Sequence, residues 1–214
     1  MKLNYNKTKV ITFNPCTSKD FMPKMIFEDN ELEFVNVIKI LGLTIRSDMK
    51  WTTNTENMIH KACKKLWILR RLKFIGAKVI DLVEVYCKQI RCILELAVPA
   101  WQGSITQAER LAIERVQKIA CCIILGDKYL SYKSALKTLN LVSLESRRKK
   151  LSLKFALKAS KHSKFKFWFK PNNSNMNTRN EKPKFCDVRA NHSRFQNSAL
   201  SYLTRLLNEH YKNK

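Results

Sequence analysis

The chain has 214 residues, of which 41 are Lys or Arg and 17 are Asp or Glu, so its formal net charge is +24. This excess lies far from the near-balance of an ordinary soluble domain and indicates a polyanionic partner, with nucleic acid the commonest candidate and acidic lipid its rival. No run of about 18 apolar residues is present, which argues against a membrane partner entered by a spanning helix. With 45% hydrophobic residues, the sequence is able to build the core of one or two domains.

Residues 1–50 have strand character. The pattern predicts a strand over residues 10–13, a hairpin whose arms are residues 25–27 and 31–34, and an apolar strand over residues 38–45 that contains a glycine. These strands predict a small antiparallel sheet. Standing alone they would leave an unpaired edge and only marginal stability.

Residues 51–163 are predicted to form a helical bundle. Helices are expected over residues 54–74, 78–98, 107–125 and 131–139, followed by a helix that Ser143 caps. Two starts have capping-box spacing, Thr53 with Glu56 and Thr106 with Glu109.

The expected helix ends are marked by glycine and proline. Gly76, Gly103 and Gly126 follow three helical segments, where a left-handed closing residue is favoured. Pro99 is expected to stop the second helix. That helix has balanced charges and is therefore interpreted as scaffold.

The first predicted helix divides its faces. At 100° per residue its apolar side chains share one side, and its cations gather on the opposite one at Lys61, Lys64, Lys65 and Arg71. Glu56 is the only acid between residues 55 and 74. This scarcity favours a helix that lays cations along a phosphate backbone over the alternative of a solvated charged surface.

The segment from residue 143 to 170 combines a basic run with aromatic residues. Its helix carries cations and no acid after Glu145, and the segment interleaves Phe155, Phe165, Phe167, Trp168 and Phe169. Cations would hold phosphates while rings stack unpaired bases. The alternative, that the rings seal the bundle beside a solvated or nuclear-directing stretch, stays open.

The C-terminal part divides in two. Residues 164–197 are basic and aromatic and then Asn-rich, and disorder is expected over residues 171–197. Residues 198–211 predict an amphipathic helix that docks on the bundle or on another molecule. The expected fold is therefore α+β: a small antiparallel sheet, a basic helical bundle and a partly disordered tail.

The cysteines and histidines indicate neither a metal site nor a catalyst. The seven cysteines contain no Cys-x-x-Cys pair, and the adjacent Cys121 and Cys122 are poorly placed to hold one zinc. We expect most of them in or beside helix cores. An odd number without a secretory signal fits a reducing compartment, so an intracellular location, cytoplasmic or nuclear, is expected.

Five short motifs occur in a characteristic order. They are Asn4-Tyr5-Asn6-Lys7-Thr8-Lys9 before a strand, Ile40-Leu41-Gly42, Leu69-Arg70-Arg71-Leu72, Glu114-Arg115-Val116-Gln117-Lys118 and Ile124-Leu125-Gly126. In this order the chain resembles the end of the palm and the thumb of reverse transcriptases encoded by non-LTR retrotransposons, the jockey-like and related elements. The resemblance covers roughly residues 3–170.

The resemblance implies roles for individual residues. Lys7 matches a lysine near the incoming nucleotide's phosphates that protonates the leaving pyrophosphate; an exposed edge-strand lysine is the alternative. Leu41 and Gly42 match the primer grip, where a residue without a side chain lets the backbone approach the primer end. Arg70, Arg71 and Lys118 match thumb positions that meet phosphates.

The carboxylates of polymerase chemistry are not among these motifs. Two Mg²⁺ ions clamped by carboxylates serve that reaction, and in the family these acids precede the Lys-Thr-Lys motif. No adjacent Asp pair stands in residues 1–50. Mg²⁺ is therefore expected only for the full-length polymerase. If the chain is a fragment, an upstream palm and fingers polypeptide is the expected protein partner.

The expected function is that of a truncated RNA-directed DNA polymerase that keeps primer-template binding. Expected partners are RNA, DNA and the RNA–DNA hybrid. The alternatives are a stand-alone basic helical nucleic-acid-binding module and a degenerate reading frame without selected function. The expected contact residues are Lys61, Lys64, Lys65, Arg70, Arg71, Lys118, Arg147, Arg148, Lys149, Lys150 and Lys154.

Overall fold

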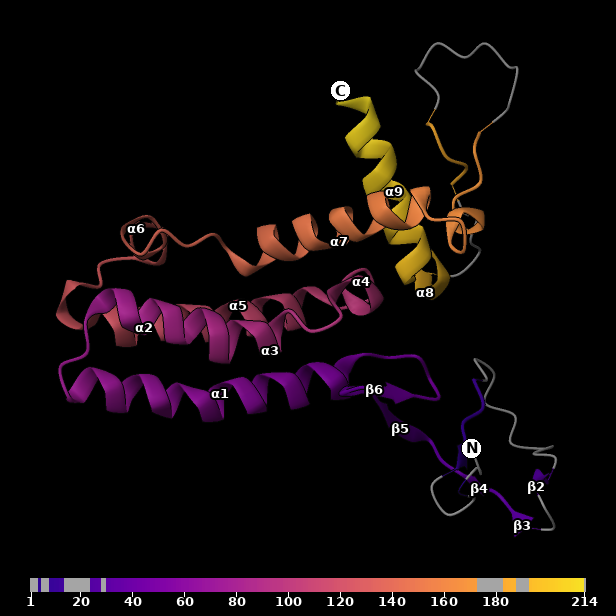
Figure 1. Ribbon diagram of the computed structural model, residues 1–214, viewed down its shortest axis with the longest axis horizontal. Helices are drawn as coiled ribbons and strands as arrows, with labels where there is room; N and C mark the ends of the chain where they lie inside the picture. The colour runs from indigo at the N-terminus through magenta and orange to yellow at the C-terminus, as the bar shows by residue number, and fades with distance from the viewer. Residues whose placement is uncertain are drawn as a thin grey trace. The chain divides into compact units, whose positions relative to one another are not determined.

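The computed structural model describes residues 4, 8–13, 24–27, 30–172, 183–187 and 193–213. It is a mixed α and β structure in which helices dominate. The chain forms two compact units, residues 1–57 and residues 58–214, and helix α1 (Thr52–Phe74) runs from the first into the second. Short strands belong to the first unit, and the other helices to the second (Figure 1).

The described residues of the first unit contain three strand pairs. Strand β1 (Lys9–Val10) pairs in parallel with β4 (Glu33–Phe34), whereas β2 (Ile26–Phe27) pairs antiparallel with β3 (Asn30–Glu31). The predicted hairpin is thus confirmed at β2 and β3, but the expectation of one antiparallel sheet is wrong. The strand expected over residues 31–34 divides at Leu32, whose amide still bonds to Met25 (2.9 Å), while the Val35 amide bonds to Val10 (2.8 Å).

The predicted primer-grip strand is a hairpin. Strand β5 (Val37–Ile40) pairs antiparallel with β6 (Leu43–Arg46), so that Ile40 faces Leu43 across the turn. Leu41 (φ 48°) and Gly42 (φ 89°) form the two-residue loop with positive φ at both positions, as tight hairpins require. The expectation of a continuous strand over residues 38–45 is therefore wrong.

The start of α1 is tied to this hairpin. The Asn54 side chain accepts a hydrogen bond from the Thr44 amide (3.0 Å). The predicted capping box is wrong because the helix begins at Thr52, ahead of Thr53. The Thr53 hydroxyl instead accepts from the Arg46 guanidinium (3.3 Å).

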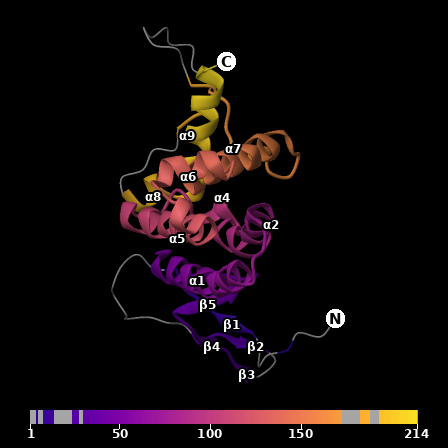
Figure 2. The same ribbon diagram turned by 90° about the vertical axis from the view of Figure 1, so that its left-hand side faces the viewer.

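Helices of the second unit follow in the order α2 (Val79–Val85), the π-helix η2 (Tyr86–Arg91), α3 (Cys92–Leu94), α4 (Val98–Trp101), α5 (Gln107–Leu125), the 3₁₀ turn η3 (Gly126–Lys128), α6 (Tyr132–Thr138), α7 (Leu144–Lys161), the 3₁₀ turn η4 (Lys166–Trp168), α8 (Ser193–Gln196) and α9 (Ala199–Lys212). In both views α5 lies between α1 and α7 (Figures 1 and 2).

The second predicted helix is built from three pieces. Leu82, Tyr86, Ile90 and Leu94 are all fully buried. In a regular α-helix with 3.6 residues per turn, side chains spaced four residues apart gradually rotate around the helix axis. The π-helix η2 has more residues per turn, which offsets this rotation and keeps the four side chains on one side. The run ends at Ala97, which has a φ of 47°. Pro99 lies in the first turn of α4, so it begins a helix and does not stop one, contrary to our expectation.

Side-chain caps set the starts of α5, α6 and α7. The Thr106–Glu109 capping box is confirmed, and Ser131 and Ser143 accept hydrogen bonds at the starts of α6 and α7. The carboxylate of Glu114 on α5 also accepts from the Leu144 and Glu145 amides (both 3.1 Å). An acid from a neighbouring helix therefore completes the start of α7.

Glycine is required at the three predicted helix ends for different physical reasons. Gly76 (φ 84°) closes α1, with its amide bonded to Lys73 (3.1 Å) and the Ala77 amide bonded to Leu72 (3.0 Å). Gly126 (φ 57°) closes α5. Gly103 has no positive φ; a Cβ there would lie 2.5 Å from that of Tyr202. Close packing of α9 explains it, so the left-handed expectation is wrong at this position.

The C-terminal segment packs on α7. Helix α9, at the predicted position, buries Leu203 and Leu207 against Ala156, Ala159 and Phe169. The Phe185 ring joins this cluster, and the Asn208 side chain bonds to both the amide and the carbonyl of Phe185 (3.0 Å each).

The expectation of disorder is therefore wrong for residues 183–187 and for α8. Its other residues from 173 to 192 lie outside the described part. Of the rings in the basic segment, Phe169 seals the core (3% exposed) whereas Phe167 is 72% exposed. The sealing interpretation is thus confirmed for Phe169, and base stacking by this segment stays a prediction.

Candidate nucleic-acid interface

Helix α1 presents the clearest cationic surface. Ala62, Leu66 and Leu69 are almost completely buried on one side, and the exposed cations on the rest of the helix are Lys61, Lys64, Lys65, Arg70 and Arg71. We call these five residues the α1 cationic face. Within the described residues none of the five has an acidic partner.

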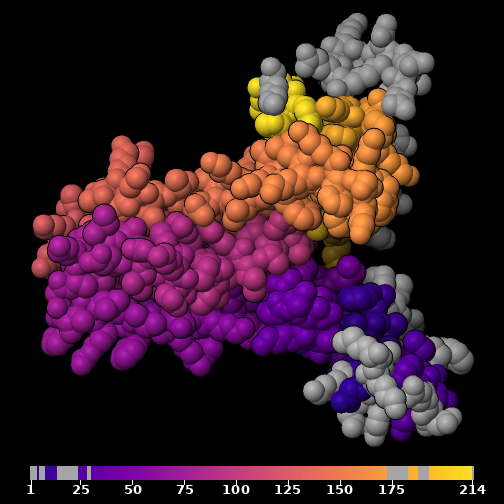
Figure 3. All heavy atoms as spheres, viewed as in Figure 1, coloured from indigo at the N-terminus to yellow at the C-terminus, as the bar shows by residue number. Residues whose placement is uncertain are grey.

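Lys73, which is not part of the α1 cationic face, anchors the end of α1. Lys73 donates to the carbonyl of Ile124 at the end of α5 (2.9 Å), where cations stabilise free helix carbonyls. The five others remain available to an external partner. Side chains of the purple segment that includes α1 protrude along the lower left edge of the molecule (Figure 3).

The predicted cations of α7 have different environments. Arg147 forms a two-point ion pair with Glu95, with 3.0 Å between Nη2 and Oε2, and Lys149 pairs with Glu209 at 2.9 Å. Lys150 and Lys154 are exposed and make no ion pair among the described residues.

Arg148 is enclosed between α4 and α7. It is fully buried, its Nε donates to the side chain of Gln102 (2.8 Å), and burial lowers the pKa of its guanidinium. Its place on the helix explains this, because it lies on the side that also buries Leu144 and Ser152. A phosphate cannot reach Arg148 while these helices stay packed, so we remove it from the candidate interface.

The other predicted contact residues are dispersed. Lys118 is exposed on α5. Leu41 and Gly42 stand at the tip of the β5–β6 hairpin in the first unit, where Leu41 is 94% exposed. Lys7 lies outside the described residues.

The candidate contacts of the second unit do not form one surface. In both views α1 and α7 lie on opposite sides of α5 (Figures 1 and 2). The α1 cationic face is the larger group, and its helix carries no acid from residue 57 onward. We therefore treat this face as the principal candidate interface.

Two aromatic residues on α1 were missed in the sequence analysis. Trp67 and Phe74 are 64% and 81% exposed, and the guanidinium of Arg71 lies 5.7 Å from the centre of the Phe74 ring. The spacing of these residues could have predicted their exposure, because at 100° per residue both rings lie on the same side of the helix as Lys64 and Arg71.

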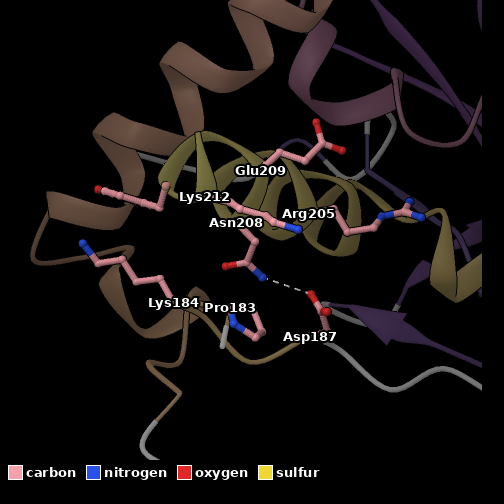
Figure 4. Close-up of a pocket in the computed structure, with 8 residues that line it drawn as sticks. Pro183, Lys184, Asp187, Arg205, Asn208, Glu209 and Lys212 are labelled. Atoms are coloured by element: carbon pink, nitrogen blue, oxygen red, sulfur yellow. Dashed lines mark hydrogen bonds between the residues drawn. The ribbon is translucent and has the colours of Figure 1, made fainter. Parts of the chain in front are cut away.

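A hollow of about 550 Å³ lies beside α9 (Figure 4). Its charged lining mixes both signs, with Lys184, Arg205 and Lys212 opposed by Asp187 and Glu209. The Asn208 amide bonds to the Asp187 carboxylate across it (3.2 Å). With three cations and two acids, the charged lining does not favour a ligand of one charge.

The described residues contain neither a grouped set of metal ligands nor a helix able to span a membrane. In the described part of the chain, no three His, Cys, Asp or Glu side chains are grouped to bind a metal ion. Among the described helices, none combines the length and the apolar character needed to cross a bilayer. Burial raises the pKa of the Cys121 thiol to about 12, which fits the predicted core position of this cysteine.

Comparison with protein-family models, with curated proteins and with solved structures gives no match to this chain.

Proposed function

We propose that this chain binds nucleic acid by laying the α1 cationic face along a phosphate backbone, with an RNA–DNA hybrid or RNA as the partner. The observation that carries the proposal is a set of five exposed cations on one acid-free stretch of helix, none of which pairs with an acid of the described residues. We further propose, from the ordered motifs, that the chain corresponds to the palm end and thumb of a non-LTR retrotransposon reverse transcriptase.

The length of the face matches the spacing of phosphates. Residues 61–71 span about 15 Å at a rise of about 1.5 Å per residue. A duplex presents about nine phosphates over that distance, at one charge per about 1.7 Å. Five contacts would give a salt slope of about −4.5 and an affinity loss of several hundredfold between about 50 and 200 mM salt.

The proposal assigns binding and no chemical step. Lys61, Lys64 and Lys65 act as point charges, while Arg70 and Arg71 are able to hold a phosphate at two points. The Leu41-Gly42 turn is the proposed primer grip. Carboxylates that hold Mg²⁺ would come from an upstream palm and fingers polypeptide, so we expect no nucleotide incorporation by the chain alone.

The test compares two variants that lose the same charge. Lys61, Lys64 and Lys65 are replaced by Ala in one variant, and the exposed Lys128, Lys133 and Lys137 in the control. Affinity for a labelled 16-base-pair RNA–DNA hybrid is measured by fluorescence anisotropy between 50 and 300 mM salt. We expect the α1 variant to lose up to about 2.7 of the salt slope while the control keeps it.

Equal losses in both variants would show that the net charge, not the α1 cationic face, holds the hybrid. Heparin is measured in parallel, because equal binding of heparin and hybrid would exclude duplex recognition. That result would leave a general polyanion-binding module. Primer extension with Mg²⁺ completes the test, since incorporation by the purified chain would overturn the binding-only assignment.

A further inference from the structure

The exposed side of α1 carries a row of alternating cations and aromatic rings. Lys64, Trp67, Arg71 and Phe74 follow one another at steps of three and four residues, so their side chains form a single ridge along the helix. All four are exposed. We call this row the α1 ridge.

The rings of the α1 ridge take no part in the core. Helix α1 packs through Ala62, Leu66 and Leu69 on its other side. The contrast with Trp101 is clear, because Trp101 is fully buried and its indole donates to the Leu96 carbonyl (2.8 Å). Large exposed rings gathered on one ridge indicate a binding surface.

The chemistry of the ridge suits unpaired nucleotides. Base faces stack on aromatic side chains, and guanidinium planes stack as well, while nearby cations hold the phosphates. Bases inside a duplex are already stacked and present no free face to such rings. A ridge of rings and cations therefore distinguishes a single strand from the duplex that the α1 cationic face alone would hold.

Resting on the proposed nucleic-acid function, we propose that the α1 ridge binds an unpaired segment of RNA or DNA, with Trp67 and Phe74 stacked on its bases and Lys64 and Arg71 on its phosphates. The rings are about 10 Å apart along the helix axis. This distance corresponds to about three base steps of a strand stacked at about 3.4 Å. The segment bound is thus a few nucleotides long.

The arrangement differs from that of a helix lying on a membrane. Such a helix has a separate apolar face that enters the lipid, with its cations on the other face. In α1 the apolar face is buried in the bundle, and the exposed rings alternate with the cations. The alternation gives each ring a neighbouring cation, which is the arrangement a nucleic-acid strand requires.

The experiment uses the full chain with Trp67→Leu and Phe74→Leu, which keep apolar bulk and remove the aromatic face. Ile80→Ala is the matched control, because Ile80 is an apolar side chain on α2 that is 74% exposed. Binding of a 12-nucleotide single strand, of the 16-base-pair hybrid and of vesicles with about one third phosphatidylserine is measured for each variant. Circular dichroism verifies the fold of each variant.

We expect each ring substitution to weaken single-strand binding about tenfold, within the range seen for loss of one stacked base. The salt slope and the affinity for the hybrid should stay unchanged, because no phosphate contact is lost. The single strand should quench the fluorescence emission of Trp67. This emission is measured as the difference between the spectra of the wild type and the Trp67→Leu variant. The Ile80→Ala variant should behave as wild type.

Three results would overturn the inference. Unchanged single-strand affinity in both ring variants, with hybrid binding intact, would exclude stacking while the proposed function survives. Equal weakening for single strand and hybrid would assign the rings to duplex contact. A loss confined to the vesicles would assign them to lipid. Absence of binding to either nucleic acid by the wild-type chain would instead refute the proposed function itself.

Discussion

Substitution of Gly103 tests how the C-terminal helix is seated. A Cβ at this position would stand 2.5 Å from Cβ of Tyr202 and 2.9 Å from the carbonyl oxygen of Asn197. Ordinary contacts between carbon atoms are about 3.5–4.0 Å, so α9 would have to move by about 1 Å or more. The Cγ of Tyr202 would also stand at 2.9 Å, but it is the Cβ and the backbone oxygen that are unable to rotate away.

We therefore expect Gly103→Ala to destabilise the chain by about 2–3 kcal/mol, at the upper end of the range for overpacking. For a chain of this size the thermal midpoint should fall by about 4–12 °C. The measurement is thermal unfolding followed by circular dichroism. A shift below about 1 °C would refute the packing of α9 against the end of α4.

Gly76 provides the matched control. A Cβ there meets nothing within 4 Å, but its φ of 84° is unfavourable for a residue with a side chain. Gly76→Ala should cost about 1 kcal/mol, and Gly76→Asn less, because Asn tolerates the left-handed region. Gly103→Asn should cost at least as much as Gly103→Ala. If Asn were tolerated at Gly103, backbone conformation and not packing would explain that glycine.

Three further predictions concern the helices of the second unit. Lys150→Ala should leave both the salt slope of nucleic-acid binding and the stability unchanged, because Lys150 lies on α7, away from the α1 cationic face. Arg147→Ala, which breaks the pair with Glu95, should lower stability without changing that slope. A reduced slope for Lys150→Ala in binding titrations, or an unchanged urea midpoint for Arg147→Ala, would contradict these assignments. Thr106→Ala should cost about 1 kcal/mol through loss of the capping box, and an unchanged urea midpoint would count against that cap. Burial raises the pKa of Cys121 from 9.0 to about 12, so the folded state keeps a proton that the unfolded chain loses, and the free energy of unfolding should fall as pH rises from about 9 towards 12. Urea midpoints at pH 8 and pH 10 should show a smaller fall for Cys121→Ala than for wild type, and equal falls would exclude this thiol as a cause.

Helix boundaries were the most predictable part of the fold. The sequence predicted α5 at its observed bounds, because the Thr106–Glu109 capping box marks its start and Gly126 its end. Local side-chain chemistry determines such ends. Where it competes with another partner the prediction failed, as at Thr53, whose hydroxyl binds Arg46.

The β5–β6 hairpin was missed because Leu41 gives no turn signal. Leucine has no preference for positive φ, and the flanking residues are apolar on both sides of the loop. The run therefore resembled one buried strand. Only the cross-strand pairing, from Val37 with Arg46 to Ile40 with Leu43, places the turn.

The exposed cations of the candidate site could be predicted where the helical spacing of apolar residues marks the buried side. They could not be predicted where a residue was chosen only because it is charged. On α1 the apolar side is distinct, so its cations were assigned correctly to the exposed side. On α7 the buried side includes Arg148, Ser152 and two alanines, which gives a weak apolar pattern. Nothing local indicates that Arg148 is enclosed, since the side chain that it binds belongs to Gln102, the residue that caps the end of α4.

The carboxylate of Glu114 makes the start of α7 a probe of the whole bundle. The first amides of a helix have no acceptor within the helix, so they normally exchange their protons with solvent quickly. The Leu144 and Glu145 amides instead bond to an acid thirty residues or more earlier in the chain. Their deuterium uptake therefore follows the separation of α5 from α7, and not the fraying of one helix end.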